Sequence, residues 1–216
     1  MIENATGLVL RTRLLTETSL IVHWLTRGSG RLAAVAKGAL RAKSPFRGKL
    51  DLFYLADFAF SRSRRSELHT LREVSLRETH PALRQDLARL RQASYCAALV
   101  EQATETETPL PAVFELMLGL LQHLGEHEAQ PRVVFAFELK LLCELGLQPD
   151  LDQSKLSPET KLLVRSLRAE PWEMLKQLTA SAPQAAELRH FLHGFLIYHL
   201  GRIPRGRDTA VDFAKR

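Results

Sequence analysis

The sequence is poor in cysteine and has no long apolar run. Its two cysteines, Cys96 and Cys143, occur among 216 residues, and neither has a second Cys or His at zinc-site spacing. We therefore expect two buried thiols in a reducing compartment, without a disulfide framework or a zinc site. No segment reaches the roughly 20 consecutive apolar residues that a membrane-spanning helix needs, and residues 1–6 lack the basic cluster of a signal peptide. These absences predict a soluble, cytoplasmic protein with no membrane partner.

Catalytic motifs are also lacking. There is no Gly-x-Ser-x-Gly elbow, no glycine-rich phosphate loop between a strand and a helix, and no acid cluster of the two-metal nuclease type. Gly28 and Gly30 fall in a predicted hairpin turn instead. We expect no catalytic residue, no cofactor and no metal, so the chain is not predicted to be an enzyme.

Two pairs of histidines are the remaining candidates for chemistry. His123 and His127 are four residues apart, which places both on one face of a helix, but the stretch is polar and ends a helix. We predict a solvated surface there rather than a metal site. His190 and His193 lie in an aromatic-rich segment without an obvious carboxylate nearby, and we predict core or boundary positions for them.

Acidic residues are absent from residues 18–50, although this stretch holds seven Lys and Arg. Residues 1–80 hold 14 Lys and Arg against 7 Asp and Glu, a net charge of +7, whereas residues 81–216 hold 16 against 17, a net charge of −1. A uniform positive field attracts phosphates, because each neutralised phosphate releases condensed counterions. We therefore predict a nucleic-acid-binding domain over residues 1–80 and a helical domain over residues 81–216.

The first 80 residues have the pattern of a small β-barrel. Alternating apolar residues between turn signals predict strands over residues 7–13, 19–26, 31–37, 52–60 and 67–76. The glycines of residues 27–30 predict a hairpin turn, and a long basic connection, residues 38–49, separates the third and fourth strands. This arrangement favours a five-stranded OB-type barrel. An SH3-like barrel stays open, because periodicity alone does not separate the two.

After Pro81 the apolar residues recur at helical spacing. Ser157 is the predicted N-cap of a helix that begins with proline. One or two helices are predicted to run from residue 83 through residue 99 and to end at the acidic, Thr-rich residues 104–108. Further helices are predicted over residues 113–124, 133–145, 171–178 and 183–200. The predicted fold class is α+β, with an N-terminal OB-type barrel followed by an all-α domain.

The basic connection combines cations with Gly38, Ser44 and Phe46. In single-strand-binding surfaces cations follow the backbone and aromatic rings stack on bases, and this mixture supplies both. We predict that the cations of the barrel form a path for nucleic acid, with three further arginines at its rim. The predicted binding residues are Arg11, Arg13, Lys37, Arg41, Lys43, Arg47, Lys49, Arg62, Arg64 and Arg65.

A second candidate surface lies near the C-terminus. Three arginines follow an aromatic segment, and an apolar groove rimmed by cations would suit an acidic peptide ending in aromatic residues. A solvated basic tail is the alternative. The residues predicted to bind such a peptide are Arg202, Arg205, Arg207, Phe195 and Tyr198.

Taken in order, several segments resemble the bacterial RecO recombination mediators. Residues 137–152, with the sequence FELKLLCELGLQPDLD, are similar to that family's signature in its helical domain. Tyr198-His199-Leu200-Gly201 with the basic run after it resembles the family's C-terminal stretch. The N-terminal resemblance is carried by Glu17-Thr18-Ser19-Leu20-Ile21-Val22, Leu25-Thr26, Gly30-Arg31, Val35-Ala36-Lys37-Gly38-Ala39, Ser44 and Gly48-Lys49-Leu50.

The resemblance implies an OB fold followed by a helical domain, in a nucleoid-associated cytoplasmic protein. It also implies binding of single- and double-stranded DNA, annealing of complementary strands, and action with RecR to help RecA displace the single-stranded DNA-binding protein. The acidic tail of that last protein is the implied peptide partner. From the residues alone, an RNA-binding accessory protein on the same barrel and a structural helical adaptor remain alternatives.

One departure from the family concerns zinc. Family members often carry cysteine pairs just after the Leu-Gly-x-x-Pro-Asp-Leu stretch, here residues 145–151, in a zinc-ribbon-like insertion. In this sequence Asp152 leads through residues 153–158 without a cysteine. We expect a zinc-free, shortened member.

Overall fold

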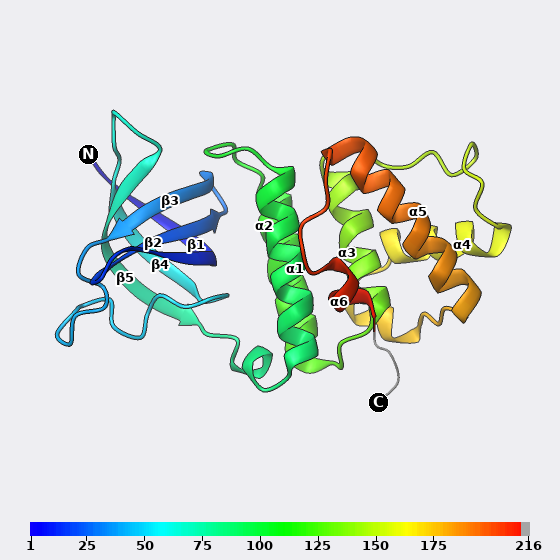
Figure 1. Ribbon diagram of the computed structural model, residues 1–216, viewed down its shortest axis with the longest axis horizontal. Helices are drawn as coiled ribbons and strands as arrows, with labels where there is room; N and C mark the ends of the chain where they lie inside the picture. Colours follow the sequence, from blue (N-terminus) through cyan, green and yellow to red (C-terminus); the bar gives the residue numbers. More distant parts are fainter. Residues whose placement is uncertain (213–216) are drawn as a thin grey trace. The chain divides into compact units, whose positions relative to one another are not determined.

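The computed structural model describes residues 1–212, which form two compact units. The first, here called the barrel unit, consists of Met1–His80 and Thr104–Glu115. The second, the helical unit, consists of Pro81–Ala103 and the chain from Leu116 onward. Figure 1 labels the strands and the helices.

Five strands close into a barrel in the order β1-β2-β3-β5-β4. Neighbouring strands are antiparallel, except that β3 and β5 run parallel. This closed five-stranded arrangement confirms the predicted OB-type barrel. The strands are β1 (Ile2–Thr16), β2 (Ser19–Thr26), β3 (Gly30–Ala36), β4 (Leu55–Ser61) and β5 (Leu68–Glu78).

Strand β1 is longer than the predicted residues 7–13 because it serves two neighbours. Its first half pairs with β4 and its second half with β2. A register shift between Val9 and Arg11 marks an irregularity close to where the strand passes from one partner to the other, and such irregularities bend a strand. Closure of the barrel therefore sets the length of this strand.

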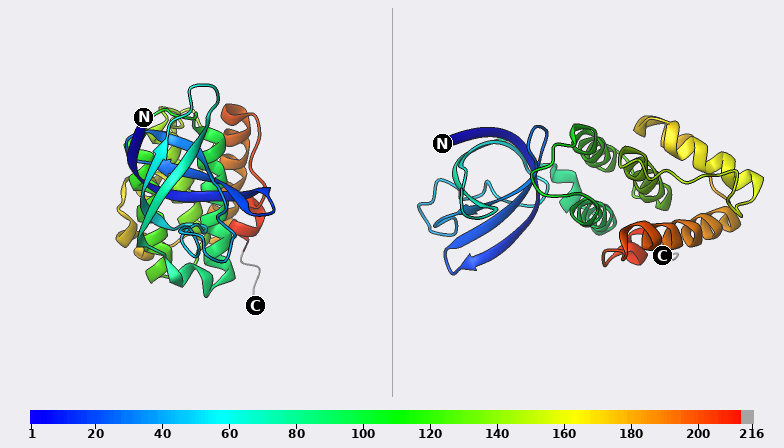
Figure 2. Two further views of the ribbon diagram at one scale, coloured as in Figure 1. Left: turned by 90° about the vertical axis from the view of Figure 1, so that its left-hand side faces the viewer. Right: turned by 90° about the horizontal axis from the view of Figure 1, so that it is seen from above.

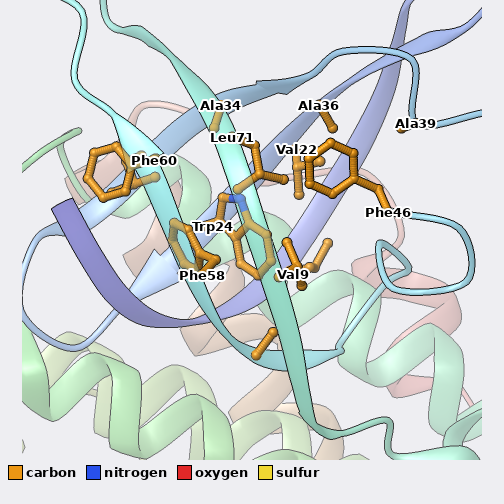
Figure 3. Packing of buried hydrophobic residues seen from close by; sticks show 13 residues of the cluster. Val9, Val22, Trp24, Ala34, Ala36, Ala39, Phe46, Phe58, Phe60 and Leu71 are labelled. Atoms are coloured by element: carbon orange, nitrogen blue, oxygen red, sulfur yellow. The ribbon is translucent and has the colours of Figure 1, made fainter. Parts of the chain in front are cut away.

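Aromatic side chains fill the barrel. Trp24 of β2 and Phe58 of β4 stack with their ring centroids 4.2 Å apart, and Phe60 lies 5.8 Å from Phe58. Figure 3 shows these rings between the strands, with Val9 and Leu71 in the same cluster. Because alternate residues of a strand point to opposite faces, the inward set forms one core. Burial of each large side chain contributes about 2–3 kcal/mol.

The connection from β3 to β4 is a chain of tight turns over residues 37–54. The backbone N–H groups of Arg41, Ser44 and Arg47 each donate to the carbonyl three residues earlier, at 3.1–3.2 Å. Phe46 turns inward, is 7% exposed and joins the barrel core (Figure 3). Residues 52–54, predicted as part of the fourth strand, belong to this connection, because Phe53 takes a left-handed φ of 64° there.

The Thr104–Glu115 segment packs on the barrel. The Arg31 guanidinium Nε donates to the Thr104 hydroxyl at 2.8 Å, and the Glu107 N–H donates to the Arg31 carbonyl at 2.7 Å. Gly30 has a φ of 65°, and a Cβ there would lie 2.0 Å from the Thr108 carbonyl oxygen. Only glycine permits this close approach. The first unit therefore includes residues that lie among the helices in the sequence.

The helical unit is built around α3, which contacts α1, α4, α5 and α6. In the right-hand view of Figure 2, α3 is seen nearly end-on and α5 runs across the view. None of the described helices is long and apolar enough to cross a membrane. The helices are α1 (Leu87–Ala103), α2 (Pro111–Glu126), α3 (Pro131–Glu144), α4 (Pro158–Ala169), α5 (Ala182–Leu200) and α6 (Arg207–Val211), with 3₁₀ turns η1 (Pro81–Arg84) and η2 (Trp172–Gln177).

Local sequence determines where two of these helices begin. The Ser157 hydroxyl accepts from the Thr160 N–H, which confirms the predicted N-cap of α4. Ser181 and Gln184 form a capping box at the start of α5. The α-helix predicted over residues 171–178 is instead the 3₁₀ turn η2. Its Trp172 ring packs so closely on α2 that a Cβ at Gly119 would lie 2.4 Å from the indole nitrogen.

Candidate nucleic-acid interface

Two exposed cations lie on β1, beside β2. Arg11 and Arg13 are exposed on β1, and Arg11 pairs in register with His23 of β2. Burial, together with the positive charges of Arg11, Arg13 and Arg31, lowers the pKa of His23 to about 4. His23 is therefore kept neutral mainly by burial, and the nearby arginines act in the same direction.

The β3–β4 connection carries the second group of cations. Lys37, Arg41, Lys43 and Arg47 are exposed, whereas the Lys49 ammonium donates to the Val74 carbonyl at 3.2 Å. The successive turns place these side chains in solvent while Phe46 enters the core. The first residues of the connection lie next to the start of β2, because the Gly38 N–H donates to the Ser19 hydroxyl at 3.1 Å.

Three of the seven acids of residues 1–80 lie on β4 and β5. Asp57 of β4 accepts from the Thr6 hydroxyl and from the Arg77 guanidinium, each at 2.6 Å. Both hydrogen bonds lower the pKa of Asp57, that from Thr6 more strongly. Glu73 and Glu78 belong to β5. The acids of β5 alternate with Arg72 and Arg77, whereas residues 18–50 hold seven Lys and Arg and no acid.

The structure separates Arg62, Arg64 and Arg65 from the other predicted cations. They lie in the turn between β4 and β5, near the beginning of β3, whereas the basic connection leaves the end of β3 (Figure 1). Seven residues of strand span about 20 Å. Arg62 is also paired with Glu3 at 2.7 Å and Glu107 at 2.6 Å, while Arg64 and Arg65 are exposed.

The prediction that Phe46 offers a ring to stacked bases is wrong. Its side chain is buried among the residues of the barrel core, because the turns on either side point it inward. The connection therefore presents cations to solvent without that ring.

Arg207 was predicted as an accessible cation, and this is also wrong. Its guanidinium is 3% exposed and makes a two-pronged ion pair with the Glu138 carboxylate, at 2.7 and 2.9 Å. The Tyr95 hydroxyl donates to the same carboxylate at 2.6 Å. Burial, with the adjacent Glu138 charge, raises the pKa of Tyr95 well above its ordinary value, so it remains a donor. This cluster stabilises the core of the helical unit.

The other residues of the predicted peptide surface are accessible to different degrees. Arg202, Arg205 and Tyr198 are exposed. Phe195 is half-buried between Phe191 and His199, with ring centroids at 5.7 and 4.3 Å.

A cavity of about 430 Å³ lies between α3, α5 and α6 in the same unit. Its walls include the apolar side chains of Phe135, Ala186 and Val211. His190 and His193 also line it, and both are exposed, which contradicts the prediction of core or boundary positions. The two histidines occupy the open side of α5, because its buried positions are Leu188, Leu192 and Leu196.

Two further predictions about reactive side chains are corrected. His123 is buried rather than solvated, and its ring stacks on His127 with centroids 4.5 Å apart. Cys96 is buried as predicted, but Cys143 is exposed in the last turn of α3.

Among residues 1–212, no three His, Cys, Asp or Glu side chains come together as metal ligands. After α3 the chain makes a short turn in which the Asp152 N–H donates to the Asp150 carboxylate at 3.0 Å. Leu151 of this turn is buried.

Sequence reasoning missed two features of the barrel. His23 lies opposite Arg11, because β1 and β2 pair in that register, and no linear pattern signals this pairing. A small apolar cavity lies beside the basic connection, and no sequence pattern signals it because its walls come from separate turns.

A closed OB-type barrel with one cationic side, followed by a helical unit, is the architecture of a class of nucleic-acid-handling proteins. Comparison with known proteins narrows this class. Residues 1–80 match the family described as "Recombination protein O N terminal", and residues 84–155 match "Recombination protein O C terminal". The chain belongs to the bacterial RecO family of DNA repair proteins.

Individual relatives agree with this assignment. The chain is 34% identical to the DNA repair protein RecO of Bacillus pumilus over 71% of its own length, and 34% identical to that of Exiguobacterium sibiricum over 70%. These matches span 59% and 60% of the two relatives. The match to the RecO of Bacillus subtilis is 32% identical and covers 98% of this chain and 85% of that protein.

Proposed function

We propose that this protein is a DNA-binding recombination mediator that binds single- and double-stranded DNA and anneals complementary strands. The observation that carries the proposal is the exposure of the cations on consecutive turns of residues 37–49, within a stretch free of acids. Arg11 and Arg13 extend this positive surface along β1. Membership of the RecO family supports the assignment to DNA.

Annealing follows from the kind of contact that this surface offers. Exposed Lys and Arg neutralise phosphates and screen the repulsion between two strands. They leave the Watson–Crick edges of most bases free, so complementary strands pair while both are held. The protein needs no catalytic group for this activity.

Charge reversal in the β3–β4 connection tests the proposal. We expect Lys37→Glu, Arg41→Glu and Lys43→Glu together to abolish annealing of complementary oligonucleotides. The matched control reverses three exposed cations of the helical unit, Arg91, Lys155 and Lys176, which changes the net charge by the same amount. Annealing that survives in the first variant, or that is lost equally in both, contradicts the assignment.

The exposed Arg64 and Arg65 are proposed as a secondary contact for longer strands or duplexes. Arg62 contributes less, because Glu3 and Glu107 compete with phosphate for its guanidinium. Lys49 contributes less for a similar reason, since its ammonium holds the Val74 carbonyl.

An RNA-binding accessory role is the alternative on the same barrel, because exposed cations do not distinguish the two nucleic acids. Competition of RNA against labelled DNA of the same sequence separates these roles. RNA that displaces the DNA at lower concentration than unlabelled DNA would favour the alternative.

We further propose that the helical unit docks the acidic tail of the single-stranded DNA-binding protein, and that RecR acts with this chain to load RecA. Arg202, Arg205, Tyr198 and Phe195 are the proposed tail contacts, and Arg207 is removed from this set because it is buried. The family assignment supports these partners. RecA assembly on coated single strands, measured with and without RecR, tests the mediator role.

Two surfaces of the helical unit compete for the tail. Titration of the tail peptide against Arg202→Glu and against Ala186→Glu separates the C-terminal cations from the cavity beside α5. Loss of affinity in the first variant supports the proposed contacts. Loss of affinity in the second variant alone would place the peptide site at the cavity. If both variants bind the peptide as tightly as the unaltered protein does, the peptide role is wrong.

A further inference from the structure

A small apolar cavity opens in the middle of the cationic β3–β4 connection. Its volume is about 220 Å³, and its walls include Leu20, Leu40, Phe46, Leu50 and Arg47. It lies within the barrel unit, and phosphate binding does not account for it. An apolar cavity surrounded by cations calls for a ligand that is apolar in one part and anionic in another.

The turns hold this cavity in place. The Leu40 N–H donates to the Thr18 carbonyl at 3.0 Å, and the Lys49 N–H donates to the Phe46 carbonyl at 3.0 Å. Phe46 is buried in the core, while Leu40 is 51% exposed. The Phe46 wall of the cavity is therefore part of the core, whereas the Leu40 wall is an exposed apolar side chain among cations.

The charges around the cavity suit a nucleic-acid backbone. Arg47 is one wall, and its Nη1 donates to the Ala42 carbonyl at 3.1 Å, which orients the guanidinium across the turn. Arg41 and Lys43 are exposed a few residues away. These cations occupy successive turns, so they match the regular charges of a phosphate chain better than the scattered carboxylates of a peptide.

We propose that this cavity receives one unstacked base of single-stranded DNA while Arg41, Lys43 and Arg47 hold the flanking phosphates. The inference rests on the proposed DNA binding by the same connection. Contact of one base with an apolar wall adds affinity whatever its identity. A duplex keeps its bases stacked and paired, so the cavity favours single strands over duplexes.

Comparing the affinities for a normal and an abasic oligonucleotide distinguishes binding of a base from binding of phosphates. We expect the protein to bind an oligonucleotide with bases about tenfold more tightly than an abasic strand with the same number of phosphates, at one salt concentration. Leu40→Gln removes an apolar wall without changing the net charge. It should abolish this preference and leave the affinity for the abasic strand unchanged.

Leu14→Gln is the matched control, because Leu14 is another exposed leucine of the barrel unit, at 71%, and does not line the cavity. This variant should keep the full preference. Equal binding of both strands by the unaltered protein, or a preference that survives Leu40→Gln, would overturn base capture while leaving DNA binding intact.

Two other results would also decide against the proposal. If neither strand binds, the proposed DNA-binding function fails together with the cavity assignment. If an acidic peptide ending in an aromatic residue displaces the base-bearing strand from the unaltered protein but not from Leu40→Gln, the cavity is a peptide site instead.

Discussion

His123 is an imidazole enclosed by the helical unit and only 5% exposed. Burial, together with the neighbouring positive groups His127 and Arg132, lowers its pKa to about 4. In the unfolded chain the same side chain titrates near its ordinary value of 6.5. The unfolded state therefore binds a proton first as the pH falls, so His123 favours folding above pH 6.5 and progressively opposes it between pH 6.5 and 4.

Replacement of His123 should flatten this dependence. Between pH 7 and pH 4.5 the free energy of unfolding should fall in both proteins. We expect the fall to be about 2 kcal/mol smaller in His123→Gln than in the unaltered protein, a figure that allows for relaxation and solvent screening. Urea unfolding at the two pH values measures the difference. His190→Gln, at an exposed position, is the control. The explanation fails if the two variants show the same pH dependence.

Buried charge has a different consequence at Arg207. Its guanidinium, the Glu138 carboxylate and the Tyr95 hydroxyl satisfy one another in the core of the helical unit. Removal of one charge of such a pair typically costs about 3–5 kcal/mol, because the other remains buried and unpaired. Arg207 thus belongs to the core, although its neighbours Arg202 and Arg205 are accessible.

Among the elements, the Thr104–Glu115 segment depends most on a single glycine. Gly30 allows the Thr108 carbonyl to approach β3, and Arg31 then pairs with Thr104. A side chain at position 30 meets both a left-handed φ and the carbonyl of Thr108. A side chain at position 30 would therefore displace the segment at Thr108.

We expect Gly30→Ala to destabilise the protein by at least about 2 kcal/mol and to expose the segment to protease. Gly28→Ala is the matched control in the same turn, because a Cβ there meets nothing within 4 Å. It should change the free energy of unfolding by less than about 0.5 kcal/mol. Urea unfolding and the cleavage rate near Thr108 measure the two effects. Equal stability of the two variants would contradict the role of the close approach.

The β3–β4 connection illustrates how an element without regular structure positions side chains. Its repeated turns send Lys37, Arg41 and Lys43 into solvent and Phe46 into the core. A helix in this place would repeat every 3.6 residues and arrange the same side chains on different faces. The proposed DNA surface therefore depends on turn geometry.

At the scale of the whole molecule, residues 1–80 carry an excess of positive charge. This excess is concentrated in the acid-free residues 18–50. Asp57 of β4 pairs with Arg77, and Glu3 of β1 pairs with Arg62. Residues 18–50 hold seven Lys and Arg and no acid, and they include Lys37, Arg41 and Lys43 of the β3–β4 connection. A long-range attraction for polyanions is the expected result.

We expect the affinity for single-stranded DNA to fall with salt at a slope of about −3.5 in log–log form, which corresponds to about five neutralised phosphates. The triple reversal of Lys37, Arg41 and Lys43 should reduce the slope to about −1.5. Titration at several salt concentrations measures both. An affinity that does not change with salt would sink the electrostatic explanation.

Local sequence patterns were sufficient to predict the classes of element and the position of the basic connection. Period-2 alternation predicted the barrel strands, Ser157 marked the start of α4, and a count of acids located the basic connection. These features depend on neighbours in the chain, which a linear pattern records. The quoted motifs also carried the RecO resemblance that the family comparison confirmed.

The tertiary structure alone decided which side chains are available. Phe46 and Arg207 look accessible in sequence, but the barrel core encloses the first and Glu138, 69 residues away, pairs with the second. His123 is buried by packing, and the long β1 exists because one strand must close the barrel with two partners. Each of these outcomes depends on residues that are distant in the chain, and burial and pairing arise only when folding brings them together.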